Sequence, residues 1–600
     1  MGDIKALILF SWIFLLSSIT NSQWTDGKCG QCKCYSKIER YGSRQHIANC
    51  SKRDIISVPD NLPKNIHILD LSNNFLGNSS LETLKKYGKS LTFLSLANNN
   101  ITCINESILS SFSHLADLDL TGNLLNYVGQ NLLSSLKLRT LVGIYANMFE
   151  TKCFHGHGLE RMKYLSIVFE QTDIPGDIFK YLHVFTLDIA FRTATQIPRT
   201  LFDFGTDSLT TLSIYGSKLS SLPNNIFADL AILKTLTIHG NRIRFLQPTI
   251  FNGRIPLPLY KIRIIGIKSI PRDIVFGKGN LKFLTLNGIE DIPLINIPPQ
   301  LDYLDMSNSH VYISPESLAN LNNLRSLDLH NTSLAKLDNT AFDSLKSLFS
   351  IDMSMNNITE LSGEIFKACR YTLNSLDLSH NKLQLISKLY FSSVKSLRVL
   401  NLSHNRIRYI EKDSFKRLRM LTSLNCAINL ITGLPKNVFA TAWSLKAIDF
   451  SNNNISELSS TIFITQRQLD SINLKNNPLN CDCGIRLIKM QHPYASICGV
   501  CSSPIEFKGL PVKKLKRDKT CYEFQTATSA TVQLTTKHLS PVIHLAKNNN
   551  NWDNLTSVLL YVTAAVVAIV VIVYLAVGFK TVFDQLRSGT YVLHPHNSNN

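Results

Sequence analysis

Residues 397–407 read Leu-Arg-Val-Leu-Asn-Leu-Ser-His-Asn-Arg-Ile, and residues 421–431 return to the same order of apolar and polar positions 24 residues later. Both segments follow the form L-x-x-L-x-L-x-x-N-x-L, where x is any residue. From Ile66 onward the chain returns to this form about every 24 residues, and we count 18 copies, the fourth beginning at Arg139. A return of this length predicts a repeat protein whose stacked copies bury one continuous core.

The alternation of leucines within each copy predicts its local structure. Side chains of a strand point alternately to opposite faces, so the L-x-L segment forms a short strand with its leucines turned inward. Parallel stacking of these strands gives an α/β fold, a leucine-rich-repeat solenoid (horseshoe) with a parallel β-sheet on its concave face. Phenylalanines late in the copies are expected to fill the convex side of the core, and they include Phe342, Phe366, Phe415, Phe439 and Phe463.

The asparagine at the ninth position of the copies predicts a hydrogen-bonded ladder. Its amide can pair with backbone groups of adjacent turns that would otherwise be buried without partners. Both ends of the array have it, at Asn74, Asn99, Asn123, Asn147 (in a shifted register), Asn356, Asn381, Asn405, Asn429, Asn453 and Asn477. The copies between keep only Asn241 and otherwise carry Glu170, Ala190, Ser217, Ile267, Ile289, Ser309 and Thr332. We therefore expect regular arcs at both ends and an irregular middle over residues 162–334.

Clusters of cysteines flank the repeats, where a solenoid needs capping modules to cover its apolar core. We assign disulfide caps to residues 23–65 and 480–521, with Cys29, Cys32, Cys34 and Cys50 in the first and Cys481, Cys483, Cys498, Cys501 and Cys521 in the second. The spacing of the first four would also suit zinc, but exported thiols oxidise, which favours disulfides. The pairing stays open, and the five C-terminal cysteines leave one without a partner.

Cysteines also occur within the repeats. Cys426 replaces a core leucine, and we expect it to be a buried small apolar residue. Cys103 and Cys153 lie two repeats apart, about 10 Å at the spacing of neighbouring strands. Because that separation exceeds the reach of a disulfide, we expect no bond between them unless their loops depart from the repeat.

Two apolar segments predict export and membrane anchoring. Residues 1–22 combine Lys5, an apolar run and small polar residues, which is the layout of a secretory signal peptide; an uncleaved anchor is the alternative. Residues 555–579 carry no charge and are long enough to cross a bilayer, a lipid anchor being the alternative. The remaining organisation is then 66–479 for the repeats, 522–554 for a flexible stalk and 580–600 for a short cytoplasmic tail.

The apolar segments, charge and sequons of the chain predict its cellular location, its partners and its glycosylation. We expect a single-pass type I membrane protein at the cell surface, with endosomes as the alternative location. The formal net charge of +19 would attract anionic partners, or it serves solubility. N-x-S/T sequons predict N-glycosylation at Asn49, Asn78, Asn100, Asn105, Asn331, Asn357, Asn401, Asn454 and Asn554.

A candidate binding patch follows from the strand periodicity. The second, third, fifth, seventh and eighth positions of each copy face the concave side. Through the middle these positions hold aromatic and cationic residues, which are typical of interface anchors. They are Tyr164, Phe169 and Tyr215, followed by the six that we assign to the patch, Tyr260, Lys261, Arg263, Lys282, Phe283 and Tyr303. Glycans at Asn331 and Asn401 would crowd the concave face beyond the patch, and ordinary exposed residues are the alternative interpretation.

The sequence contains no motif that indicates an enzyme. The His155-Gly156-His157 and His594-Pro595-His596 pairs lack a helical frame or a nearby acid at metal-ligand spacing. We find no glycine-rich phosphate loop and no nucleophile elbow, and an extended solenoid has no enclosed pocket by default. We therefore predict a non-enzymatic binding protein with no cofactor and no metal.

The cysteine cap, the 24-residue repeats with asparagine ladders, the irregular centre, the Asn-Pro-Leu-Asn-Cys-Asp-Cys junction at 477–483 and the apolar span resemble the ectodomain of Toll-like receptors. The resemblance covers residues 29–579. It implies lipid or lipoprotein ligands beside the ladder-poor region, and ectodomains that pair sideways, so that another Toll-like receptor is a candidate dimer partner. Two features depart from that family: the stalk, and too few residues after Phe579 for a cytoplasmic Toll/interleukin-1-receptor domain.

Three functions fit these observations. The first is a cell-surface recognition receptor or co-receptor in innate immunity that needs a partner to signal. The second is a leucine-rich-repeat cell adhesion protein, and the third is a truncated or decoy receptor that takes up ligand without signalling. The expected ligands are protein, lipid or glycan, and nucleic acid is not favoured.

Overall fold

The computed structural model describes residues 27–516, except 39–43, 130–131, 134, 151–153, 155–161, 181, 204–206, 241, 252–256, 273, 275, 277–279, 291, 293–296 and 315. The expected signal peptide, stalk, apolar segment 555–579 and tail lie outside the described residues, as do Cys521 and Asn554. Within the described part, no helix combines the length and apolar character that a membrane crossing requires. The described residues up to Leu515 belong to one unit.

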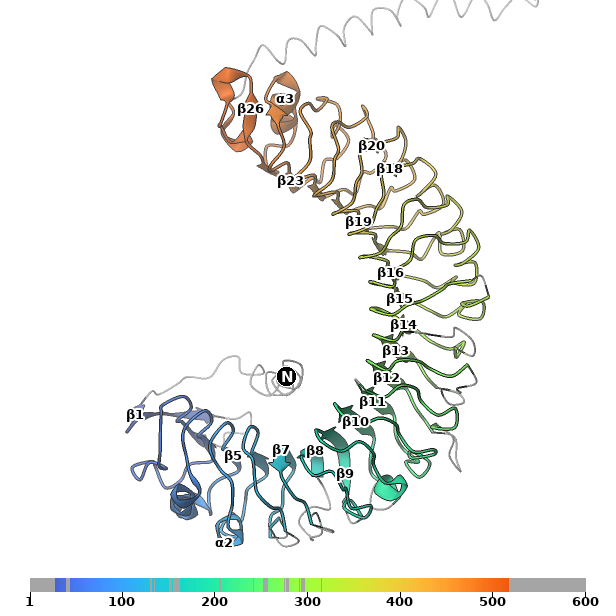
Figure 1. Ribbon diagram of the computed structural model, residues 1–600. Coiled ribbons are helices and arrows are strands. Elements are labelled where there is room, and N and C mark those ends of the chain that lie inside the picture. The colour runs from blue at the N-terminus through green and yellow to red at the C-terminus, as the bar shows by residue number, and fades with distance from the viewer. Residues whose placement is uncertain are drawn as a thin grey trace, which may run out of the picture. The chain divides into compact units, whose positions relative to one another are not determined.

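Parallel strands line the inner side of this unit, which is an open arc (Figure 1). Each strand pairs in parallel with the strand of the next repeat, so 18 such strands follow one another in the described part of the chain. They are β4 (Ile68–Asp70), β5 (Phe93–Ser95), β6 (Asp117–Asp119), β7 (Thr140–Ala146), β8 (Met162–Phe169), β9 (Val184–Phe191), β10 (Thr211–Gly216), β11 (Thr235–His239), β12 (Lys261–Ile265), β13 (Phe283–Asn287), β14 (Tyr303–Asp305), β15 (Ser326–Asp328), β16 (Ser350–Asp352), β17 (Ser375–Asp377), β19 (Val399–Asn401), β21 (Ser423–Asn425), β22 (Ala447–Asp449) and β23 (Ser471–Asn473).

The core lies behind this sheet. In β12, Ile262 and Ile264 are fully buried, while Lys261, Arg263 and Ile265 are half-buried on the concave side. This is the alternation expected of a strand with one buried face. On the convex side, phenylalanine rings of successive repeats stack as predicted, for example Phe415 on Phe439 with ring centroids 5.3 Å apart. Short elements complete that side: η1 (Asn78–Tyr87), α2 (Glu106–Leu109), η2 (Arg199–Phe202) and the paired strands β18 (Leu385–Ile386) and β20 (Tyr409–Ile410).

The asparagine ladder is present in both arcs. The Nδ2 of Asn381 donates to the carbonyls of Met353, Leu378 and Ser379, and its Oδ1 accepts from the backbone N–H of Ile358. The predicted ladder asparagines are buried, with the exceptions of Asn147 and of Asn241, which lies outside the described residues. These bonds satisfy backbone groups that would otherwise be buried without partners.

The middle of the array is irregular, but its limits differ from those we predicted. Strands from β7 to β13 are five to eight residues long, whereas the strands of the two arcs have three. The lengthened strands therefore span residues 140–287 rather than 162–334. At Ser309 and Thr332 the arc is already regular because their hydroxyls take over a part of the ladder and donate to the carbonyls of Leu286 and Leu329.

The fourth repeat corrects two predictions. Arg139 is exposed and pairs with Asp117, and Leu138 occupies the core position in its place. Asn147 is exposed and does not join the ladder. The cause is an irregularity in β7: the pairing with β8 shifts between Leu141 and Ile144, and Gly143 at φ +67° supplies the left-handed turn.

The N-terminal cap is a three-stranded antiparallel arrangement that continues into the parallel sheet. It consists of β1 (Gly27–Cys29), β2 (Cys32–Ile38) and β3 (Arg44–Asn49), and β3 pairs in parallel with β4. Disulfides join Cys29 to Cys34 and Cys32 to Cys50, as the prediction of a disulfide cap requires.

The C-terminal cap contains β24 (Leu479–Asn480), α3 (Cys483–Gln491), β25 (Ser496–Cys498), β26 (Cys501–Ser503), η3 (Ile505–Phe507) and η4 (Val512–Lys514). Cys481 pairs with Cys501, and Cys483 is also disulfide-bonded. Cys498 is a free thiol, which corrects its assignment to the disulfides. It ends β25, which pairs in parallel with β23 and so extends the sheet into the cap by one strand. Cys103 is free and exposed, and Cys426 is buried as predicted; Cys153 lies outside the described residues.

Candidate ligand-binding surfaces

The six predicted patch residues come together on the concave side of β12, β13 and β14. Strand register places Lys261, Phe283 and Tyr303 opposite one another on three successive strands. The ring of Phe283 lies between two others, with its centroid 5.2 Å from that of Tyr260 and 6.1 Å from that of Tyr303. The sheet therefore presents a continuous row of aromatic rings, whose outermost member, Tyr260, is 48% exposed.

Charges surround this row unevenly. Burial, with Asp305 and Asp328 nearby, raises the pKa of Tyr303 to about 12, and Arg263 opposes that shift. The Tyr303 hydroxyl is therefore neutral at physiological pH and able to donate a hydrogen bond. Lys261 and Arg263 have no ion-pair partner within the described part of the chain, and this leaves their charge available to a ligand.

Lys282 differs from the other five residues of the patch. Its Nζ lies 3.0 Å from the carbonyl of Gln300 and 3.3 Å from Oδ1 of Asp302. These contacts hold the ammonium against the next repeat, so Lys282 connects two repeats and is less accessible to a ligand than Lys261 and Arg263. Of the other concave candidates, Tyr215 is half-buried, Tyr164 is hydrogen-bonded to Asp188, and Phe169 belongs to the core, where it stacks on Phe191.

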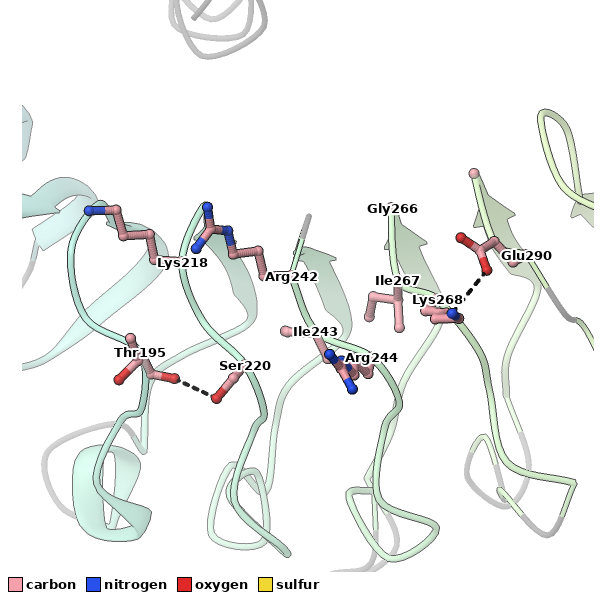
Figure 2. A pocket seen from close by; sticks show the side chains of 11 residues that line it. Thr195, Lys218, Ser220, Arg242, Ile243, Arg244, Gly266, Ile267, Lys268 and Glu290 are labelled. Carbon is pink, nitrogen blue, oxygen red and sulfur yellow. Dashed lines mark hydrogen bonds and ion pairs between the residues drawn. The ribbon is translucent and has the colours of Figure 1, made fainter.

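A second surface lies where β9 to β13 end, and the sequence did not indicate it. A groove of about 540 Å³ runs along this edge, and Figure 2 shows its side chains on successive turns of the solenoid. Four cations line it, Lys218, Arg242, Arg244 and Lys268, together with one carboxylate, Glu290. Lys218, Arg242, Lys268 and Glu290 each follow the ninth position of their repeat by one residue, and Arg244 follows it by three, where spacing predicts only loop. Because neighbouring loops stack in register, such scattered cations become one surface.

The predicted glycosylation sites differ in their accessibility. Asn78, Asn100, Asn105, Asn331, Asn357 and Asn454 are exposed, whereas Asn49 and Asn401 are half-buried. Nδ2 of Asn401, the atom that a glycan would occupy, donates to Oδ2 of Asp377 at 2.9 Å. A glycan on Asn401 would have to break this contact, which weakens the expectation that glycans crowd the concave face there.

The described residues contain no group of three His, Cys, Asp or Glu side chains that could hold a metal ion. The stacked rings of His380 and His404, 3.9 Å apart at their centroids, have no such companion. The histidine pairs at 155–157 and 594–596 lie outside the described residues.

Comparisons with known proteins agree with this architecture. The description "Leucine rich repeat" matches residues 299–358, 322–370, 371–427 and 419–479, and "BspA type Leucine rich repeat region (6 copies)" matches residues 172–293. The solenoid is therefore built of leucine-rich repeats. A solved structure of the Toll–Spätzle complex, described as a molecular hub in Drosophila development and innate immunity, has the same fold: the TM-score is 0.55 at 19% identity, over 83% of this chain and 76% of that one.

Curated relatives share the repeats at similarly low identity. Human oligodendrocyte-myelin glycoprotein is 27% identical over 234 residues, which are 35% of this chain and 45% of that protein. Chicken (Gallus gallus) Tsukushi is 28% identical over 322 residues, which are 52% of this chain and 75% of that protein. The match thus spans less than half the length of the human protein, and the similarities define a leucine-rich-repeat solenoid.

Proposed function

We propose that this protein is a Toll-like recognition receptor or co-receptor of the cell surface, acting in innate immunity, and that a partner chain completes its signalling. The observation that carries the proposal is the concave row Tyr260, Phe283 and Tyr303 with Lys261 and Arg263 beside it, two cations that form no ion pair in the described part of the chain. Aromatic rings and arginine dominate the binding energy of protein interfaces.

The ligand that suits this row is a protein. The rings lie on the open concave face of the sheet, where Phe283 and Tyr303 are half-buried and Tyr260 is 48% exposed, so an acyl chain laid on them would stay in contact with water. The Toll–Spätzle complex is a precedent for a protein partner on this fold. Membrane attachment through residues 555–579 is part of the proposal, because a receptor has to hold its solenoid outside the cell.

The test is a chimera in which the chain is extended by the signalling domain of a Toll-like receptor and expressed in reporter cells. The cells are challenged with a panel of purified secreted proteins, microbial lipopeptides and polysaccharides. We expect at least one protein to activate the reporter, and the combined Lys261→Ala, Arg263→Ala and Phe283→Ala variant to raise its half-maximal concentration about tenfold or more.

The matched control replaces exposed residues of the later arc, Lys388→Ala, Arg408→Ala and Tyr409→Ala, and should leave the response unchanged. A patch variant that responds as well as the unaltered chimera would refute the assignment of the patch. If no ligand activates the chimera and cells expressing the chain aggregate with one another, an adhesion protein replaces the receptor proposal.

A further inference from the structure

The cationic groove at the carboxyl ends of β9 to β13 is built as a regular array. The loops that carry its side chains are bonded to one another from repeat to repeat: the N–H of Ser220 donates to the carbonyl of Thr195 at 2.9 Å, that of Lys268 to Ile243 at 3.2 Å and that of Glu290 to Lys268 at 3.0 Å. Such loops keep the spacing of the strands, about 4.8 Å, so the groove spans roughly 20 Å over its repeats.

Its charge is largely uncompensated. Lys268 lies 3.6 Å from Glu290, the single carboxylate of the groove, and both side chains are exposed. Lys218, Arg242 and Arg244 have no ion-pair partner among the residues that the structure describes. Cations of one sign in a groove reinforce one another's potential and concentrate anions there. The site therefore favours a ligand that carries several negative charges along its length.

The lining narrows the class of ligand. The apolar side chains in it, Ile243 and Ile267, are buried in the core and leave no surface for an acyl chain. No aromatic ring belongs to the described lining, whereas proteins that bind single-stranded nucleic acid stack bases on such rings. Arginine forks match the planar or tetrahedral oxygens of carboxylate and sulfate groups. A chain of acidic sugars offers these groups at repeated intervals without needing an apolar or stacking surface.

We propose that this groove binds a sulfated polysaccharide along Lys218, Arg242, Arg244 and Lys268. The inference rests on the proposed extracellular position of the solenoid and not on the concave patch, since the groove lies on the loops beyond the strands. A receptor with both surfaces would hold a matrix or cell-surface glycan at its edge while its sheet engages a protein.

The experiment uses the full chain in nanodiscs of neutral lipid and a fluorescent heparin dodecasaccharide at physiological ionic strength. The test variant combines Lys218→Gln, Arg242→Gln and Arg244→Gln, and should bind about tenfold more weakly or worse. The matched control removes the same charge from the same edge of the later arc, through Lys382→Gln, Arg406→Gln and Arg408→Gln, and should bind as the unaltered chain does. Glu290→Gln releases Lys268 and should tighten binding about twofold.

Three outcomes would overturn the inference. Equal losses in the test and control variants would mean that only the net charge attracts heparin. A desulfated dodecasaccharide that binds as tightly as heparin would exclude sulfate recognition. A single-stranded oligonucleotide of equal charge that binds more tightly, and is released by the same variant, would make nucleic acid the ligand. The reporter response of the chimera does not depend on this groove, so failure of one proposal leaves the other open to its own test.

Discussion

The hydroxyl of Tyr164 on β8 donates a hydrogen bond of 2.7 Å to Oδ2 of Asp188 on β9, and both side chains are half-buried. Burial raises the pKa of Asp188, and the hydroxyls of Tyr164 and Ser213 oppose that shift by hydrogen bonding to the carboxylate. Burial and the neighbouring Asp188 also raise the pKa of Tyr164 far above its usual value. The two longest strands of the irregular middle are therefore joined by a carboxylate whose charged form is stabilised by the hydroxyls that donate to it.

We expect Tyr164→Phe to lower the free energy of unfolding by about 1–2 kcal/mol near neutral pH, because it leaves a half-buried carboxylate short of a donor. The raised pKa means that the folded state holds the Asp188 proton more firmly than the unfolded state does. Stability from this group therefore increases as the pH falls through the folded-state pKa. The loss in the variant should shrink over the same acid range, as measured by thermal unfolding. Tyr312→Phe, at a site that is 86% exposed, is the control; a loss independent of pH would contradict the account.

The sequence predicted the parts of this fold that repeat. In the two regular arcs, a core leucine or a ladder residue such as Asn356 has the same environment from copy to copy, so its spacing in the sequence predicts where it lies. The sequence also predicted that Tyr260, Phe283 and Tyr303 lie together, because strand periodicity and the stacking of copies determine which side chains are neighbours on the concave face.

The departures arise where one copy differs from the rest. The shifted pairing at Gly143 moves Leu138 into the core and Asn147 out of it, and spacing alone assigned both positions incorrectly. The cationic groove was missed for another reason. Its side chains come from loop positions that the repeat pattern leaves undefined, and they form one surface only because the loop of Arg242 and Arg244 is bonded to that of Lys268.

The hydrogen bonds of the ladder predict that loss of one asparagine side chain lowers the free energy of unfolding substantially. Asn381→Ala removes three donated bonds and leaves the N–H of Ile358 without its acceptor, all in a buried setting. We expect a loss of about 2–4 kcal/mol, which denaturant unfolding would measure. Asn322→Ala, at an exposed position, should change stability by less than about 0.5 kcal/mol. Similar values for the two variants would mean that the ladder contributes little.

The C-terminal cap offers a matched pair of cysteine substitutions. Cys501→Ser breaks the bond to Cys481 across 20 residues of sequence and should destabilise the cap by about 3 kcal/mol. Cys498→Ser, three residues away, alters a free thiol and should cost far less. Peptide mapping without reduction and hydrogen exchange of α3 would measure both effects. Equal destabilisation by Cys498→Ser would indicate that Cys498 is bonded after all.

Ile428 occupies a left-handed backbone position, with φ +55°, and its side chain is 42% exposed. The two repeats that follow place asparagine in this conformation, and their amides bond to one another: Nδ2 of Asn476 donates to Oδ1 of Asn452 at 2.8 Å. A β-branched residue is strained there, whereas asparagine tolerates it.

Ile428→Asn should therefore raise the free energy of unfolding by about 1–2 kcal/mol, through relief of this strain and through a new acceptor for the Asn452 amide. Ile428→Val keeps the branched side chain and should bring no gain, which separates backbone relief from the mere loss of an exposed apolar group. Thermal unfolding of the two variants beside the unaltered chain provides the measurement. If asparagine is no better than valine, Ile428 is unstrained at this position, and the outer asparagine contacts contribute nothing to the stability of the arc.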